Sequence, residues 1–116
     1  MLPIQRLPSA PGRSRTTVYG NLIFTVATAD TYDLDMRKQT REALEKLDRN
    51  LAEVGSDKSR LLSVTGYITD MALKPQMNEV WMQWVDQENA PQRACIGATL
   101  EDGDMIEIVA VAATKD

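Results

Sequence analysis

Arg93 and Glu107 are the two residues whose types and surroundings point most directly to chemistry. Arg93 precedes the small apolar run of residues 94–98, and Glu107 lies between Ile106 and Ile108. A guanidinium binds a carboxylate through two parallel hydrogen bonds, which lysine cannot do. A partly desolvated glutamate can hold and activate a water molecule or move a proton. An anion anchor and a water-handling carboxylate together suit hydrolysis of a small carboxylated substrate.

Each candidate residue also has a structural explanation, which stays open at this point. Most arginines lie at surfaces with their stems on apolar groups, and Glu107 could pair with a cross-strand Lys or Arg or reach solvent at a sheet edge. Cys95 lies two residues after Arg93, and a lone cysteine in such a run is more often a small buried residue than a nucleophile. Asn78, at the start of a predicted helix, is a further candidate.

Composition excludes several classes of function. The chain has 116 residues, a formal net charge of −4, no histidine and one cysteine. It therefore lacks the ligands of a zinc site and a histidine-based triad, and we expect no metal or cofactor. The acidic balance argues against nucleic-acid binding. With no disulfide and no apolar run of membrane-spanning length, a cytoplasmic protein is expected.

The first 28 residues divide into two segments of different composition. Residues 1–15 contain Pro3, Pro8, Pro11 and Gly12 and show no period, which predicts an irregular N-terminal arm. Residues 16–116 are predicted to form a single domain. Residues 16–28 are rich in β-branched residues and predict two strands joined tightly at residues 19–21, where Gly and Asn tolerate a positive φ.

Helical and strand periods alternate along the rest of the chain. Apolar residues at three- and four-residue steps predict a helix over residues 33–54, started by Asp33 or Asp35 and ended by Gly55. Alternation predicts a strand over residues 60–69, and Pro75 opens a second helix. Two strand-like runs joined by a turn at residues 101–104 close the chain, with Arg93 and Glu107 expected on adjoining strands.

This order of elements predicts an α+β fold in which both helices pack on one face of a sheet. The run from Met105 to Ala113 is apolar at almost every position except Glu107, which indicates burial on both sides. The chain offers no third layer for the second face, so another subunit is expected to cover it.

The chain resembles the Rid/YjgF family of reactive-intermediate deaminases, once named L-PSP endoribonucleases and translation inhibitors, over roughly residues 19–113. The segments that carry the resemblance are residues 20–25, Gln39-Thr40 with Ala43-Leu44, Gly55-Ser56-Asp57, Met77-Asn78 with Trp81, Pro91-Gln92-Arg93 and Ile106-Glu107-Ile108.

The resemblance implies a chorismate-mutase-like fold with a mixed sheet, assembled as a homotrimer with clefts between subunits. It also implies an enamine or imine deaminase that converts 2-imino acids to 2-oxo acids and ammonia without a cofactor. Arg93 would bind the carboxylate and Glu107 would position the attacking water. Backbone groups around Cys95 and the side chain of Asn78 would support the substrate.

Two departures leave the substrate open. Arg13-Ser14-Arg15 stands where the best-known subgroup has Gly-Pro-Tyr, and Val26-Ala27-Thr28 stands where it has Ser-Gly-Gln. One alternative is therefore a non-catalytic, small-carboxylate-binding or regulatory protein. Another, suggested only by the family's older name, is an endoribonuclease or translation inhibitor.

Overall fold

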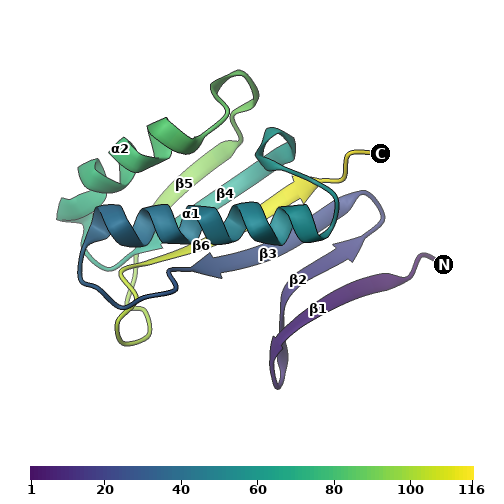
Figure 1. Cartoon of the computed structure of the whole chain (residues 1–116), viewed down its shortest axis with the longest axis horizontal. Coiled ribbons are helices and arrows are strands. Elements are labelled where there is room, and N and C mark those ends of the chain that lie inside the picture. The colour runs from purple at the N-terminus through teal and green to yellow at the C-terminus, as the bar shows by residue number, and fades with distance from the viewer.

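A computed structural model describes all residues from Met1 to Asp116. It is a mixed six-stranded sheet with both helices on one face (Figure 1). The strands are β1 (Ile4–Ala10), β2 (Arg13–Tyr19), β3 (Leu22–Thr28), β4 (Leu61–Ile68), β5 (Gln92–Gly97) and β6 (Ile106–Ala113), and the helices are α1 (Met36–Glu53) and α2 (Lys74–Trp84). The α+β fold expected from the order of elements is thus confirmed.

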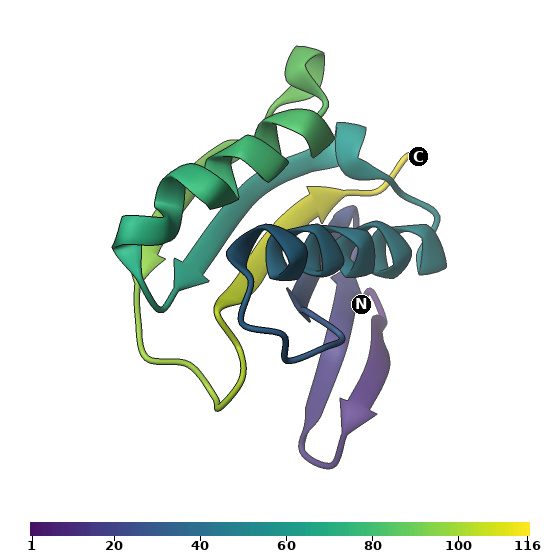
Figure 2. The ribbon, with the colours of Figure 1, turned by 60° about the vertical axis from the view of Figure 1, so that its left-hand side comes forward.

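The sheet order is β1-β2-β3-β6-β4-β5. Only β4 and β5 pair in parallel, connected through α2, and every other neighbouring pair is antiparallel. The last strand of the chain therefore lies in the middle of the sheet. Figure 2 shows the resulting curved layer with both helices on the same side of it.

The prediction of an irregular N-terminal arm over residues 1–15 is wrong, because residues 4–10 form an edge strand and residues 13–15 begin the next one. Proline is tolerated at an edge strand, where its missing N–H is not needed by a second neighbour. Pro8 lies at a shift in the register with β2, and Gly12 makes the turn with a φ of 84°. The domain boundary expected at residue 16 is absent.

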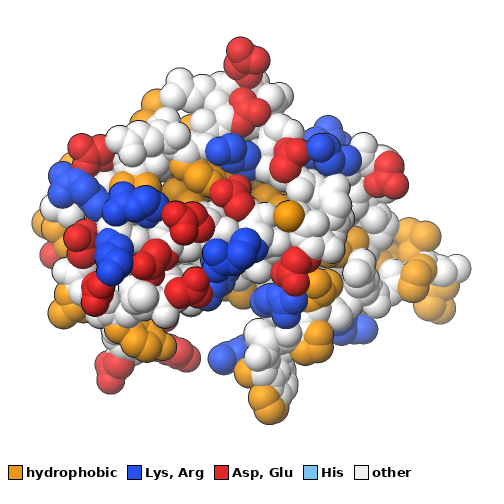
Figure 3. Space-filling view, viewed as in Figure 1, with side chains coloured by type: hydrophobic (Ala, Val, Ile, Leu, Met, Phe, Trp, Pro, Cys, Tyr) orange, Lys and Arg blue, Asp and Glu red, His pale blue; other side chains and the backbone are white.

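The core lies between the sheet and the helices. Helix α1 begins at its cap Asp35, whose side chain accepts from the Lys38 N–H, and Gly55 follows its end with a φ of 75°. The inward face of this helix is buried against the sheet residues Ile23, Ile108 and Ala110. The helix residues on this face are Met36, Ala43, Leu44, Leu47 and Leu51. The outward face of the same helix carries interspersed cations and carboxylates (Figure 3). The long amphipathic helix is confirmed.

A buried polar cluster joins α1 to the β2–β3 hairpin. Asn50 Nδ2 donates to Thr25 Oγ1 at 3.0 Å and to the Val26 carbonyl at 3.1 Å, and Thr25 Oγ1 lies 2.9 Å from Thr16 Oγ1. Buried polar groups must be hydrogen-bonded to avoid a desolvation cost, and here they fix one helix to two strands.

Strand β4 carries one irregularity that alternation alone does not show. The register with β6 shifts between Leu61 and Ser63. Leu61 is consequently buried, while Leu62 is 48% exposed, although the sequence pattern places Leu62 with the inward residues Val64 and Ile68. An extra residue in one strand moves the following side chains to the other face.

The sheet face away from the helices is apolar and uncovered in the single chain. Phe24 of β3 is 43% exposed and Val109 of β6 is 39% exposed, and these two strands are direct neighbours. Contiguous apolar surface of this kind is typical of an interaction site. No helix of the structure is long and apolar enough to cross a membrane.

Candidate functional site

Arg93 lies on the helix side of β5, the edge strand of the sheet. It pairs with the buried Val64 of β4, and paired residues share a face. Its Nη1 donates to Asn78 Oδ1 at 2.8 Å, and its guanidinium carbon lies 5.5 Å from the centroid of the Trp81 ring. None of the six ion pairs of the chain includes Arg93. A guanidinium has five N–H donors, so most of its capacity is left for an anion.

Helix α2 sets this position through its own start. Pro75 lies in the first turn, where a missing N–H costs nothing, and the helix then presents Asn78 and Trp81 on the same side, three residues apart. The amide oxygen and the aromatic face both favour a cation. Arg93, Asn78 and Trp81, with the free edge of β5, form what we call the Arg93 half-site.

Cys95 is also on the helix side of β5, with its Sγ 4.0 Å from Met77 Sδ. The thiol is partly buried against the core. The backbone of Cys95 faces away from β4. The Ala98 N–H points toward β4, where it donates to the Ile68 carbonyl, and successive residues of an extended strand direct their backbone groups to alternate sides. The N–H and C=O of Cys95 therefore point to the unpaired edge, where a ligand can reach them.

Glu107 lies on the opposite face of the sheet. It pairs with Thr28 of β3 and with Tyr67 of β4, and it shares its face with the exposed Val109. The side chain is half-buried and makes neither a hydrogen bond nor an ion pair within the chain. It lines a polar cavity of about 470 Å³, which we call the Glu107 cavity. Its charged lining residues are Arg13, Arg15, Lys46, Glu101, Asp104 and Glu107.

The expectation that Arg93 and Glu107 occupy adjoining strands is wrong, because β4 lies between β5 and β6. Val64 of β4 pairs with Arg93 on one side and with Ala110 of β6 on the other. Ala110 is three residues along β6 from Glu107. An odd offset places two side chains on opposite faces. Two strand spacings and three residue rises separate their Cα atoms by roughly 14 Å. One chain therefore carries two half-sites that do not meet.

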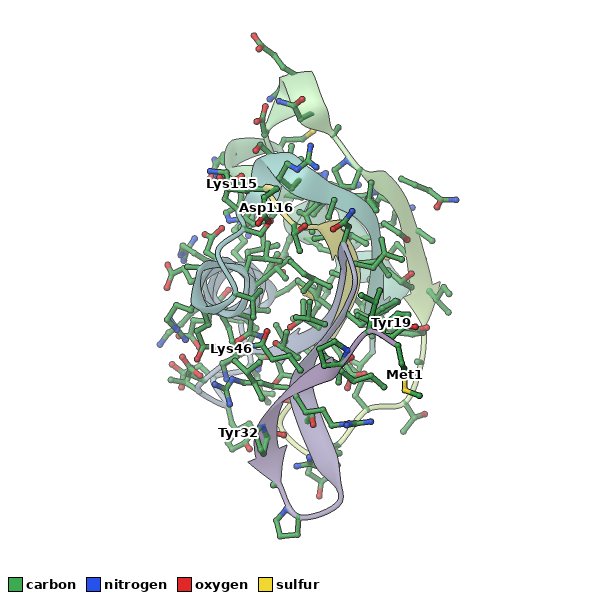
Figure 4. All side chains as sticks on the ribbon, turned by 90° about the vertical axis from the view of Figure 1, so that its right-hand side faces the viewer. Met1, Tyr19, Tyr32, Lys46, Lys115 and Asp116 are labelled. Atoms are coloured by element: carbon green, nitrogen blue, oxygen red, sulfur yellow. The ribbon has the colours of Figure 1, made fainter.

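Two of the cations of the Glu107 cavity are already engaged. Arg15 pairs with Glu53 at 2.6 Å, and Lys46 pairs with Asp30. Arg13 makes no ion pair. The ion pair with Arg15 holds the pKa of the Glu53 carboxyl below its usual value, and hydrogen bonding to Lys46 does the same for the pKa of Asp30. Figure 4 labels Lys46 on the side of α1 that faces the β1–β2 hairpin.

Sequence reasoning did not identify Asp104 or Lys46 as site residues. No local pattern marks them: one is in a polar turn and the other is on the solvated side of a helix. They meet Glu107 only because the loop before β6 folds back beside α1. A second cavity, next to Arg93 and lined largely by apolar residues of the core, has a volume of about 20 Å³. That is room for about one water molecule and no substrate.

The comparisons with known proteins cover nearly the whole chain. Residues 12–114 match the family model Ribonuc_L-PSP, described as Endoribonuclease L-PSP. A RutC family protein of Haemophilus influenzae is 32% identical over 114 residues, which is 96% of this chain and 98% of that protein. The chain belongs to the Rid/YjgF family.

Solved structures of the Rid/YjgF family share the fold. NMB1025 of Neisseria meningitidis, a member of the YjgF family, has a TM-score of 0.93 at 33% identity, covering 98% of this chain and 97% of that one. A protein of Salmonella typhimurium has a TM-score of 0.89 at 33% identity, covering 98% and 100%. That protein is named as a candidate translation initiation inhibitor, whereas the family model is named for an endoribonuclease, so the names of these proteins do not agree on one activity.

Proposed function

We propose that the protein is a cytoplasmic, cofactor-free hydrolase that converts a 2-imino acid, or the enamine from which it forms, to a 2-oxo acid and ammonia. The observation that carries the proposal is Arg93, a guanidinium fixed by Asn78 and Trp81 on an open strand edge without any carboxylate partner. Fixed but unneutralised, it is prepared to bind the carboxylate of a substrate. Membership of the Rid/YjgF family agrees with this role.

The two half-sites require a second copy of the chain to complete them. We propose a homotrimer in which the apolar faces containing Phe24 and Val109 turn inward. The free edge of β5 from one subunit would then lie beside the Glu107 cavity of the next. This arrangement covers the exposed apolar surface and brings Arg93 and Glu107 to one substrate from two chains.

In the completed site, Arg93 holds the carboxylate and the outward backbone groups of Cys95 contact the same end of the substrate. Glu107 accepts a hydrogen bond from a water molecule and directs its oxygen at the imine carbon. Fixing the imine next to a positioned water replaces an encounter in solution by a reaction within one complex. Asn78 acts through Arg93 and is a positioning residue.

Release of ammonia from freshly generated 2-iminopropanoate, corrected for hydrolysis in buffer, tests the proposal. We expect Arg93→Ala to lose most of the enzyme-dependent rate, by 100-fold or more, because a charged hydrogen-bonded pair is lost. Arg41→Ala is the matched control, since Arg41 is an exposed arginine of α1 outside both half-sites. An Arg93→Ala protein as active as the parent would show that Arg93 is not the anchor.

A second candidate is a non-catalytic protein that binds a small carboxylate. The observation in its favour is that Arg13 and Arg15 border the Glu107 cavity, in the segment that departs from the best-known subgroup of deaminases. Titration calorimetry that finds 2-oxo acid binding dependent on Arg93, together with no ammonia release, would favour this candidate. RNA cleavage, which the name of the family model suggests, has the net charge of −4 against it.

A further inference from the structure

The backbone on both sides of Asp104 is held by one buried side chain, Gln39, whose Nε2 also donates to the Asp33 carbonyl at 2.9 Å. Gln39 of α1 is fully buried, and its Nε2 donates to the Gly103 carbonyl at 2.8 Å while its Oε1 accepts from the Met105 N–H at 2.8 Å. The two bonds grip the backbone on both sides of Asp104. The Asp104 N–H also donates to the Glu101 carbonyl at 3.0 Å. The loop is therefore rigid at this one residue.

Packing on Gly103 adds to this rigidity. Gly103 has a φ of 90°, and the Tyr32 ring occupies the space where a side chain would stand, with Cδ1 only 2.4 Å from an ideal Cβ position. Tyr32 lies at the same end of the molecule as Lys46 (Figure 4). A glycine in this conformation, covered by an aromatic ring, fixes the direction in which the next residue leaves the turn.

The Asp104 carboxyl has an unusual environment for an aspartate. Its Oδ1 is buried and has no hydrogen-bond partner in the chain, the only such side-chain atom in the structure. A buried polar atom without a partner is rare and calls for a functional explanation. Burial raises the pKa of Asp104, the negative charge of Glu101 raises it further, and Lys46 opposes the shift.

Asp104 and Glu107 line the same cavity from the loop and from β6. The other charged groups that face this cavity are Arg13 and Arg15 of β2, Lys46 of α1 and Glu101 of the loop. Arg15 and Lys46 are neutralised by Glu53 and Asp30, so neither serves as a close partner for Asp104. The cavity thus holds three carboxyl groups, and two of them, the desolvated Asp104 and the half-buried Glu107, lie in different environments. Such a pair is typical of a site that needs both an acid and a base.

We propose that Asp104 is the proton donor to the nitrogen of the imine, and that Gln39 positions it. The inference rests on the proposed function. As the water oxygen bonds to the imine carbon, Glu107 takes one proton from that water and Asp104 gives its proton to the nitrogen. This produces a carbinolamine, an Asp104 carboxylate and a protonated Glu107.

The second half of the reaction restores both groups. Glu107 gives its proton to the amino group, the carbon–nitrogen bond breaks, and ammonia leaves. The hydroxyl proton passes to Asp104 as the carbonyl of the 2-oxo acid forms. One water is consumed and one ammonia is released, with no oxidant, reductant or other reactant.

Asp104→Asn is the direct test, because it keeps the shape of the side chain and removes the transferable proton. We expect kcat for ammonia release to fall about 100-fold, the lower end of the range for general acid catalysis, with KM within about twofold of the parent. In the parent, kcat should decline as pH rises through the pKa of Asp104, because the donor form is lost. In Asp104→Asn this decline should be absent. Asp102→Asn, an exposed neighbour in the same loop, is the matched control.

Two further variants keep the test decisive. Asp104→Glu retains an acid one methylene away and should keep the pH-dependent decline at a reduced kcat, even if Asp104→Asn folds poorly. Gln39→Glu should remove the hydrogen bonds to the Gly103 and Asp33 carbonyls, because a carboxylate cannot donate, and should lower kcat without removing the decline. An active parent whose Asp104→Asn variant has the same kcat and pH profile would overturn the role of Asp104 alone. A parent with no enzyme-dependent ammonia release would instead overturn the proposed function, and this inference with it.

Discussion

At the scale of single residues, this protein shows how differently one residue type behaves in different surroundings. Asp57 accepts hydrogen bonds from the Ser59 hydroxyl at 2.5 Å and from the Ser59 N–H at 2.9 Å, and it pairs with Lys115 at 2.9 Å. Those contacts lower the pKa of Asp57 to about 2, with the Ser59 hydroxyl contributing most. Asp104, without such partners, has its pKa raised by burial. Hydrogen bonds favour the charged form and desolvation favours the neutral one.

Asp57 makes the stability of the protein depend on pH in a defined window. Its pKa falls from an ordinary value of 3.8 to about 2 on folding, so its contribution is complete above about pH 4 and is lost as pH falls toward 2. We expect Asp57→Ala to lower the free energy of unfolding by about 1 kcal/mol at pH 7, as for the loss of a cap. Urea unfolding at several pH values measures this. A difference from the parent that stays constant from pH 7 to pH 2 would contradict the assignment.

At the scale of elements, helix α1 contributes residues to the hydrophobic core and also hydrogen-bonds to the segments that carry the site. Its inner stripe packs on the sheet, Asn50 bonds to β3, and Gln39 grips the loop before β6. The period of apolar residues predicts this helix, and of the two candidate caps, Asp33 and Asp35, the structure uses Asp35. The period does not predict that Gln39 is fully buried, because two of the three backbone groups that bond to its amide belong to residues 103 and 105, far along the chain.

Removing one large core side chain from α1 should be severely destabilising. Leu47 is fully buried, and Leu47→Ala is expected to cost about 2–5 kcal/mol through lost apolar burial and the cavity left behind. Denaturant unfolding followed by circular dichroism gives the value. Glu45→Ala, an exposed change in the same helix, should remain within about 0.5 kcal/mol of the parent. Equal effects from both variants would contradict the packing described for α1.

The strands show what the sequence pattern leaves out. Alternation identifies β4, while β-branched composition identifies β3 and a nearly continuous apolar run identifies β6. These patterns do not give the order of the strands, since periodicity describes faces and not neighbours, and the insertion of β4 between β5 and β6 separates Arg93 from Glu107. Strand β1 was missed because prolines that exclude a central strand are compatible with an edge. The sequence identifies Arg93 and Glu107 individually as candidate site residues, but their relative positions follow only from the strand order of the fold.

At the scale of the whole molecule, the uncovered sheet face determines the expected assembly. Val109 is 39% exposed in the middle of this face. Val109→Glu should place a charge inside the proposed trimer interface, where it would be desolvated without a partner, and should therefore yield monomers that keep the helical circular dichroism signal. Sedimentation velocity distinguishes the two masses. Arg41→Glu, on the outer face of α1, should leave the assembly unchanged, and a monomeric parent would rule out the trimer.

The central position of β6 has a consequence for how the chain is made. Strand β6 lies between β3 and β4 and is the only strand that joins the N-terminal three-stranded part of the sheet to the β4–β5 pair. It is also synthesised after the other five strands of the sheet. Until residues 106–113 emerge, β3 and β4 each present an unpaired inner edge, and the residues that pair between β3 and β6 are 79 to 91 positions apart in the chain. Folding of the sheet during synthesis therefore waits for residues 106–113, and a nascent chain that stalls before this strand exposes two unpaired strand edges at once.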